Sequence, residues 1–145
     1  MEVEMAEELA SQNSTEDTVN ILIYSDDATT RREILTAVGR RPAKGLPEIT
    51  WKETATQAAA ITAVKEGKFD LLILDAETPK LGGMGLGKMV HDEIDPNMPF
   101  INLIGRPQDE WLSRWSGAVA AVAYPIDSRE LAEAVASVLT SRTKA

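Results

Sequence analysis

The chain has no cysteine and a single histidine among its 145 residues. The absence of cysteine excludes disulfide bonds, zinc–thiolate sites and thiol catalysis, and one histidine is too few for a multi-histidine metal centre. Apolar stretches are short, and none approaches the ~20 residues that a membrane-spanning helix requires. The N-terminus has neither the basic start nor the apolar core of a signal peptide. These absences predict a cytoplasmic protein that does not insert into a membrane by itself.

Basic residues are missing from the first 18 positions, where acidic side chains contribute most of the formal net charge of −8. The acidic residues there are Glu2, Glu4, Glu7, Glu8, Glu16 and Asp17. Low hydrophobicity and high charge predict that residues 1–18 form a flexible acidic tail. The rest of the chain is close to neutral, which gives no electrostatic reason to bind nucleic acid.

Short apolar runs alternate with helical patterns from Val19 onward. Continuous runs such as Phe69–Leu74 and Phe100–Ile104 are typical of strands buried on both faces of a parallel sheet. Five such strand–helix units predict an α/β fold, a doubly wound five-stranded parallel sheet of flavodoxin-like (βα)5 topology. We expect this domain to cover residues 19–141, with a C-terminal tail at 142–145. In such folds the functional residues gather where the strands end.

Three segments near the predicted strand ends resemble the receiver domains of two-component response regulators. Ile21–Asp27 is similar to the first strand and the acidic cluster that follows it. Leu71–Asp75 is similar to the phospho-acceptor segment, with a Pro four residues and a Gly eight residues after Asp75. Gly117–Pro125 is similar to the segment that ends in Lys-Pro, whose peptide bond is cis. The likeness is to stand-alone, atypical actinobacterial receivers.

The resemblance implies that Asp75 is the phospho-acceptor and that Mg²⁺ is held by acidic residues after the first strand together with the acceptor. Transfer of a phosphoryl group to a carboxylate requires its charge to be neutralised and the attack to be held in line. The implied metal ligands are Asp26, Asp27 and Asp75. We expect weak Mg²⁺ binding, because Ser25 occupies the first acidic position.

Three further positions depart from the receiver pattern. The Ser/Thr that donates to the phosphoryl group falls on Ile104, the Lys falls on Tyr124, and the aromatic switch residue falls on Ala121. A lost charge-assisted hydrogen bond costs roughly 1.5–3 kcal/mol. Together with Ser25, these positions predict a degenerate site and a protein that is not an enzyme.

Simpler interpretations of some of these residues stay open. Asp75 is also compatible with a polar strand end, and Asp26 with a cap for the helix that follows it. The segment Gly82–Met89 matches a phosphate-binding loop except at Met89, where Ser or Thr is required. A glycine-rich start to the third helix explains that segment better.

Trp111 and Trp115 lie one turn apart on a helix predicted from Pro107 to Ser116. The corresponding helix of receivers belongs to their usual docking surface, and Trp is enriched in binding hot spots. The two residues are therefore candidates for partner binding, although rings that fill the core would show the same spacing.

Two functional hypotheses follow. The first is a degenerate receiver that acts by protein–protein docking, as an accessory subunit of a larger assembly. Here the resemblance implies a respiratory complex such as NADH:quinone oxidoreductase, reached at the inner face of the membrane through that partner. The alternative is a working phospho-acceptor, phosphorylated on Asp75 by a histidine kinase in a two-component phosphorelay.

Overall fold

A five-stranded parallel sheet forms the centre of the computed structural model, which describes residues 18–78 and 82–144. The strand order is β2-β1-β3-β4-β5. The strands are β1 (Thr18–Tyr24), β2 (Glu48–Thr54), β3 (Leu71–Asp75), β4 (Phe100–Ile104) and β5 (Ala120–Ala123). The helices are α2 (Ala28–Val38), α3 (Gln57–Glu66), α4 (Gly83–Glu93), α5 (Glu110–Trp115) and α6 (Ser128–Lys144), with a 3-10 turn η1 (Pro107–Asp109). The predicted doubly wound α/β fold is confirmed.

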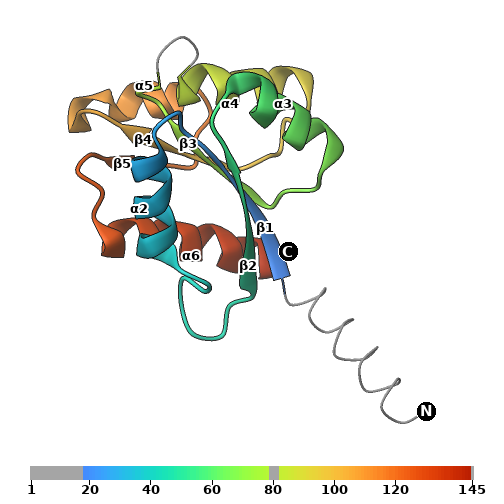
Figure 1. The fold of residues 1–145 in the computed structure, drawn as a ribbon, viewed down its shortest axis with the longest axis vertical. Coiled ribbons are helices and arrows are strands. Elements are labelled where there is room, and N and C mark those ends of the chain that lie inside the picture. Colours follow the sequence, from blue (N-terminus) through green and yellow to red (C-terminus); the bar gives the residue numbers. More distant parts are fainter. Residues whose placement is uncertain (1–17, 79–81, 145) are drawn as a thin grey trace.

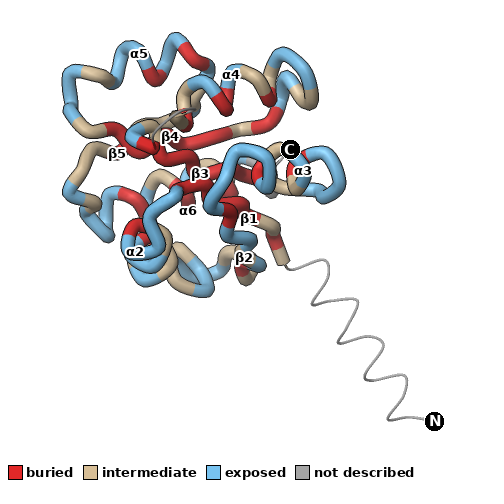
Figure 2. Tube along the Cα trace, turned by 45° about the horizontal axis from the view of Figure 1, so that its top comes forward, coloured by how far each residue is buried: buried red, intermediate tan, exposed pale blue. Residues whose placement is uncertain are grey.

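Helices cover both faces of this sheet (Figure 1). On one face α2 and α6 pack together against residues such as Ile21 and Ile73, and on the other α3 and α4 pack against Leu22 and Leu72. Every residue of β3 and β4 is buried, as Figure 2 shows for the central strands. These are the continuous apolar runs of the sequence, buried on both sides as expected.

The first strand and the last helix reach slightly beyond the residues 19–141 expected for the domain. β1 begins at Thr18, one residue before the predicted start, and the acidic segment 1–17 lies outside the described residues. Residue 141 lies inside α6, because no Gly or Pro interrupts the helix before Lys144. No helix in the described part of the chain is long and apolar enough to cross a membrane.

The glycines of α4 allow this helix to pack closely on the sheet. A Cβ atom on Gly83 would lie 2.8 Å from backbone and side-chain atoms of Leu74. A Cβ atom on Gly87 would overlap the ring of Phe100. Glycine at these positions therefore serves contact between helix and sheet, which accounts for much of the likeness to a phosphate-binding loop.

Candidate functional site

The candidate site lies at the edge of the sheet where β1, β3 and β5 end. A cavity of about 620 Å³ opens there. Its lining consists of Asp26, Asp27, Thr29, Thr30, Glu33, Asp75, Glu77, Gly105, Tyr124 and Pro125. The parallel strands thus bring the sequence-predicted Asp26, Asp27, Asp75 and Tyr124 to one place.

Asp75 is the last residue of β3 and is only 4% exposed. Its Oδ2 accepts a hydrogen bond from Ser25 Oγ at 2.7 Å, and its Oδ1 accepts one from the Glu77 N–H at 2.9 Å. Ser25 follows β1 directly and is fully buried, and its Oγ also accepts from the Asp27 N–H at 3.2 Å. Both carboxylate oxygens of Asp75 are therefore bound to donors within the protein.

Tyr124 follows β5 and precedes Pro125 through a cis peptide bond, as the resemblance implies. Its hydroxyl is buried close to Asp75 and Thr30 without meeting either in a well-formed hydrogen bond. Burial, reinforced by the negative charge of Asp75, raises the pKa of Tyr124 far above its ordinary value. The side chain is therefore neutral at physiological pH, whereas a Lys at this position would carry a positive charge.

No Lys or Arg within residues 18–78 and 82–144 forms an ion pair with Asp75. Arg31 reaches this edge of the sheet, yet its guanidinium donates to the carbonyl oxygen of Ser25 at 2.7 Å and to Glu53 at 3.2 Å. Among the described residues, five carboxylates line the cavity and no basic side chain does. This charge opposes the approach of an anionic phosphoryl donor.

The acidic side chains do not gather into a metal centre. Asp27 Oδ1 accepts from the Thr29 N–H at 2.8 Å and caps α2, a role that sequence reasoning had considered for Asp26. Asp26 is exposed beside it. Among the described residues, no group of three or more His, Asp or Glu side chains is placed to share an ion. The arrangement does not fit the three-carboxylate Mg²⁺ set that the resemblance implies.

Glu77 is a site residue that sequence reasoning missed. A Cβ on Gly105, which follows β4, would overlap the Glu77 carboxylate, so the glycine leaves room for that side chain. Ile104 is buried at the end of β4 and supplies no hydroxyl, and the half-buried Ala121 in β5 supplies no ring. The position of Glu77 two residues after Asp75 was the available signal.

The two candidate partner-binding residues lie on α5, outside the cavity. Trp111 is 69% exposed and Trp115 is 66% exposed, so the core-filling alternative is wrong. The buried side of α5 carries Ser113, followed after the helix by the buried Ser116. This helix therefore turns its small polar side chains inward and its large apolar ones toward solvent.

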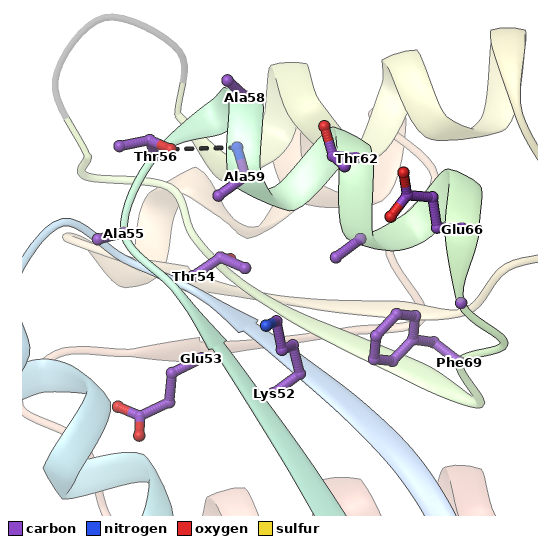
Figure 3. A pocket seen from close by; sticks show the side chains of 12 residues that line it. Lys52, Glu53, Thr54, Ala55, Thr56, Ala58, Ala59, Thr62, Glu66 and Phe69 are labelled. Atoms are coloured by element: carbon purple, nitrogen blue, oxygen red, sulfur yellow. Dashed lines mark hydrogen bonds between the residues drawn. The ribbon is translucent and has the colours of Figure 1, made fainter.

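A second groove, of about 810 Å³, lies between β2 and α3 (Figure 3). Ala and Thr side chains form much of its lining, and Thr56 Oγ1 caps α3 by accepting from the Ala59 N–H at 3.1 Å. It shares no lining residue with the acidic cavity and contains none of the predicted site residues.

Two proteins of Mycobacterium tuberculosis, from strains CDC 1551/Oshkosh and H37Rv, are each 42% identical to the chain over 121 residues. The match covers 83% of this chain and 91% of each relative, and both are described as uncharacterized response regulatory proteins. The chain belongs to the response-regulator receiver family. No protein-family model matches it.

Solved structures show the same fold. The receiver domain of a Francisella response regulator superposes with a TM-score of 0.71 at 22% identity, covering 86% of this chain and 98% of its own. A CheY-like receiver protein from Methanospirillum hungatei gives 0.70 at 23% identity, covering 88% and 98%. The co-crystal structure of the Saccharomyces cerevisiae histidine phosphotransfer protein Ypd1 with the receiver domain of Ssk1 contains a chain that gives 0.73 at 17%, covering 86% and 91%. The receiver is a non-catalytic signalling fold that typically binds Mg²⁺.

Proposed function

We propose that this receiver acts by docking to a protein partner through α5, without stable phosphorylation of Asp75. The observation that carries the proposal is the orientation of α5, whose Trp111 and Trp115 point into solvent while Ser113 is buried. A helix that forms part of a core normally shows the opposite arrangement. Large apolar side chains exposed together on one element indicate a surface that another protein covers.

The surroundings of the two tryptophans resemble a protein interface in their chemistry. Leu112, on the same helix, is also exposed and adds to the apolar surface of α5. The Lys88 ammonium lies 5.3 Å from the centroid of the Trp115 ring. We call Trp111, Leu112 and Trp115 the α5 patch. An apolar centre with a charged margin is the usual anatomy of a binding surface.

The acidic cavity supports the second part of the proposal. A phosphoryl group on Asp75 would displace the donor from one of its carboxylate oxygens, either the Ser25 hydroxyl or the Glu77 N–H, and would add negative charge among five carboxylates. Neither Tyr124 nor Ile104 carries a positive charge that would compensate for the added negative charge, and Ile104 also lacks a hydroxyl. Differential stabilisation of a phosphorylated state, which a switch requires, therefore has little support here.

Capture of the partner by the wild-type protein, followed by titration of that partner against variants, tests the docking proposal. Wild-type protein isolates its partner from native lysate, and the purified partner is then titrated against Asp75→Asn, Trp51→Phe and the double variant Trp111→Ala/Trp115→Ala. We expect unchanged affinity for the first two and loss of binding for the third, because hot-spot residues contribute most of the binding energy. Trp51→Phe is the matched control, since Trp51 lies on β2, away from the α5 patch. Loss of binding in well-folded Asp75→Asn would contradict the proposal.

The finer expectations stay predictions. A respiratory complex such as NADH:quinone oxidoreductase as the partner, the cytoplasmic location, and a contribution of residues 1–18 to docking rest on the sequence alone. Mass spectrometry of the captured partner tests the first of these directly.

A second candidate function is that of a phospho-acceptor in a phosphorelay. The position of Asp75 at the end of β3, facing the cavity, favours it. The fold likeness to a receiver crystallised with a histidine phosphotransfer protein supports docking to a partner of that kind. The two candidates differ in one observable, which is whether Asp75 is modified.

A further inference from the structure

A buried polar cluster joins α5 to the middle of the sheet. Asn102 lies at the centre of β4 and is fully buried. Its side-chain amide donates hydrogen bonds to Ser113 Oγ at 2.9 Å and to Ser116 Oγ at 3.3 Å. Ser116 Oγ in turn donates to the carbonyl oxygen of Ser113 at 2.6 Å. We call these three residues the Asn102 cluster.

Packing energy alone does not account for an amide at this position. Phe100, two residues earlier on β4, and Leu74, its register partner on β3, are both fully buried and apolar. The Oδ1 atom of Asn102 has no hydrogen-bond partner among the described residues. A buried acceptor without a partner opposes folding, and a well-packed apolar side chain of similar volume would avoid that cost.

The contacts of α5 supply a reason for the amide. This helix has six residues, and its large apolar side chains, Trp111, Leu112 and Trp115, point outward. Apolar packing is non-directional, and on this helix little of it faces the sheet. Hydrogen bonds depend on angle as well as distance, so two of them to side chains three residues apart define both the position and the rotation of the helix.

We propose that Asn102 is a positioning residue that fixes the rotation of α5 about its axis and keeps the α5 patch turned outward. Without these bonds, the apolar side chains of α5 would gain by turning toward the sheet. The Asn102 cluster opposes that rotation, because it would break both bonds and leave the amide unpartnered in the core. The positioning follows from the contacts alone, and its use for docking rests on the proposed function.

Hydrogen exchange of the α5 amides in Asn102→Leu tests the inference. Leu is branched at Cγ like Asn, somewhat larger and apolar, so it removes the two bonds and the unpartnered Oδ1 together. We expect amides of α5 to exchange about tenfold faster or more relative to those of β3, because local opening is no longer opposed by the cluster. Fluorescence anisotropy of Trp111 and Trp115, measured in a Trp51→Phe background, should fall in the same variant.

A matched control separates positioning from general loss of stability. Ile101→Val removes one methylene from the adjacent residue of β4, which packs on the opposite face of the sheet with α2 and α6. It should weaken the core without a selective increase of exchange in α5. The pair Ser113→Ala/Ser116→Ala should reproduce the effect of Asn102→Leu, and the combined variant should show less than the summed effect, because all these changes remove the same bonds.

Two results would overturn the inference. One is an α5 exchange rate in Asn102→Leu that rises no more than in Ile101→Val. The other is full additivity of the Asn102 and serine substitutions. If Asn102→Leu does not fold, the serine pair decides, and unchanged α5 exchange in that variant would overturn the inference. None of these measurements needs the partner or a phosphoryl donor, so they are independent of the proposed function.

Discussion

Ser25 Oγ donates a hydrogen bond of 2.7 Å to Asp75 Oδ2, linking the ends of β1 and β3 at the centre of the candidate site. A carboxylate at position 25, which the receiver pattern expects, would repel the charge of Asp75 and attract a cation. A hydroxyl instead stabilises Asp75 directly. The same substitution therefore removes a metal ligand and supplies an internal partner for the acceptor.

This bond should be measurable in the stability of the protein. We expect Ser25→Ala to lower the free energy of unfolding by about 1.5–3 kcal/mol, the range for hydrogen bonds to charged groups. Urea denaturation at neutral pH measures the change. Ser128→Ala, at an exposed position, serves as the control and should lie within about 0.5 kcal/mol of wild type. Equal effects of the two substitutions would show that the Ser25–Asp75 bond contributes nothing.

Tyrosine ionisation should be displaced to high pH. The chain has two tyrosines, and burial raises the pKa of both Tyr24 and Tyr124 above the ordinary value of 10.0. The negative charges of Asp26 and Asp75 add to the rise at Tyr24, and that of Asp75 adds to it at Tyr124. Tyrosinate absorbance should therefore rise at a pH above that of the unfolded chain. A titration in urea supplies the reference, and coincident curves would refute the burial argument.

The same shift predicts how stability depends on pH. Because the folded state holds the Tyr124 proton more tightly than the unfolded state does, the stabilisation is complete below about pH 10 and is lost as the pH rises further. Tyr124→Phe cannot ionise, so its free energy of unfolding should fall less steeply between pH 9 and about pH 11. Urea denaturation at both pH values measures this, and equal slopes for the two proteins would contradict it.

Two glycines of α4 should respond to alanine in opposite directions. Gly87 faces Phe100 with no room for a Cβ, so Gly87→Ala should destabilise the protein by about 1–3 kcal/mol. Gly85 is exposed on the same helix, so Gly85→Ala should stabilise it by up to about 1 kcal/mol. Thermal denaturation measures both changes, and each of the two variants serves as the control for the other. Destabilisation by both would indicate that the glycines serve something other than packing.

The contact between Glu77 and Gly105 gives a double-mutant test. Gly105→Ala should cost under about 1 kcal/mol, because the long Glu77 side chain can swing toward solvent. In a Glu77→Ala background the cost should disappear, since the obstruction is gone. Equal costs in the two backgrounds, measured by urea denaturation, would place the obstruction elsewhere.

The fold could be predicted from the sequence because the sequence patterns were local and mutually consistent. Two signals were sufficient to predict the strand type and the functional edge. They are the apolar runs around Ile73 and Ile101 and the carboxylate of Asp75 at the end of β3. The outward orientation of Trp111 and Trp115 could not be predicted, because the same spacing suits either side of a helix. That outcome depends on the hydrogen bond from Asn102 to Ser113, a contact between distant residues that no sequence periodicity reveals.

Glu77 was missed for a related reason. Its place in the cavity depends on the absence of a side chain at Gly105, which lies on another strand. The helix cap was considered at Asp26, one residue before its actual place at Asp27, because either of two adjacent aspartates satisfies the sequence pattern. Packing in the folded protein decides both the contacts between distant residues and which of two adjacent residues caps a helix.

Intact mass after incubation with acetyl phosphate and Mg²⁺ tests the central claim most directly. The account predicts no stable addition of a phosphoryl group to the wild-type protein. It also predicts modification when the missing groups are restored in Ser25→Asp/Ile104→Thr/Tyr124→Lys, because that variant regains an acidic ligand, a hydroxyl donor and a positive charge around Asp75. Stoichiometric, Mg²⁺-dependent modification of the wild-type chain that is lost in Asp75→Asn would contradict the account and establish a working phospho-acceptor.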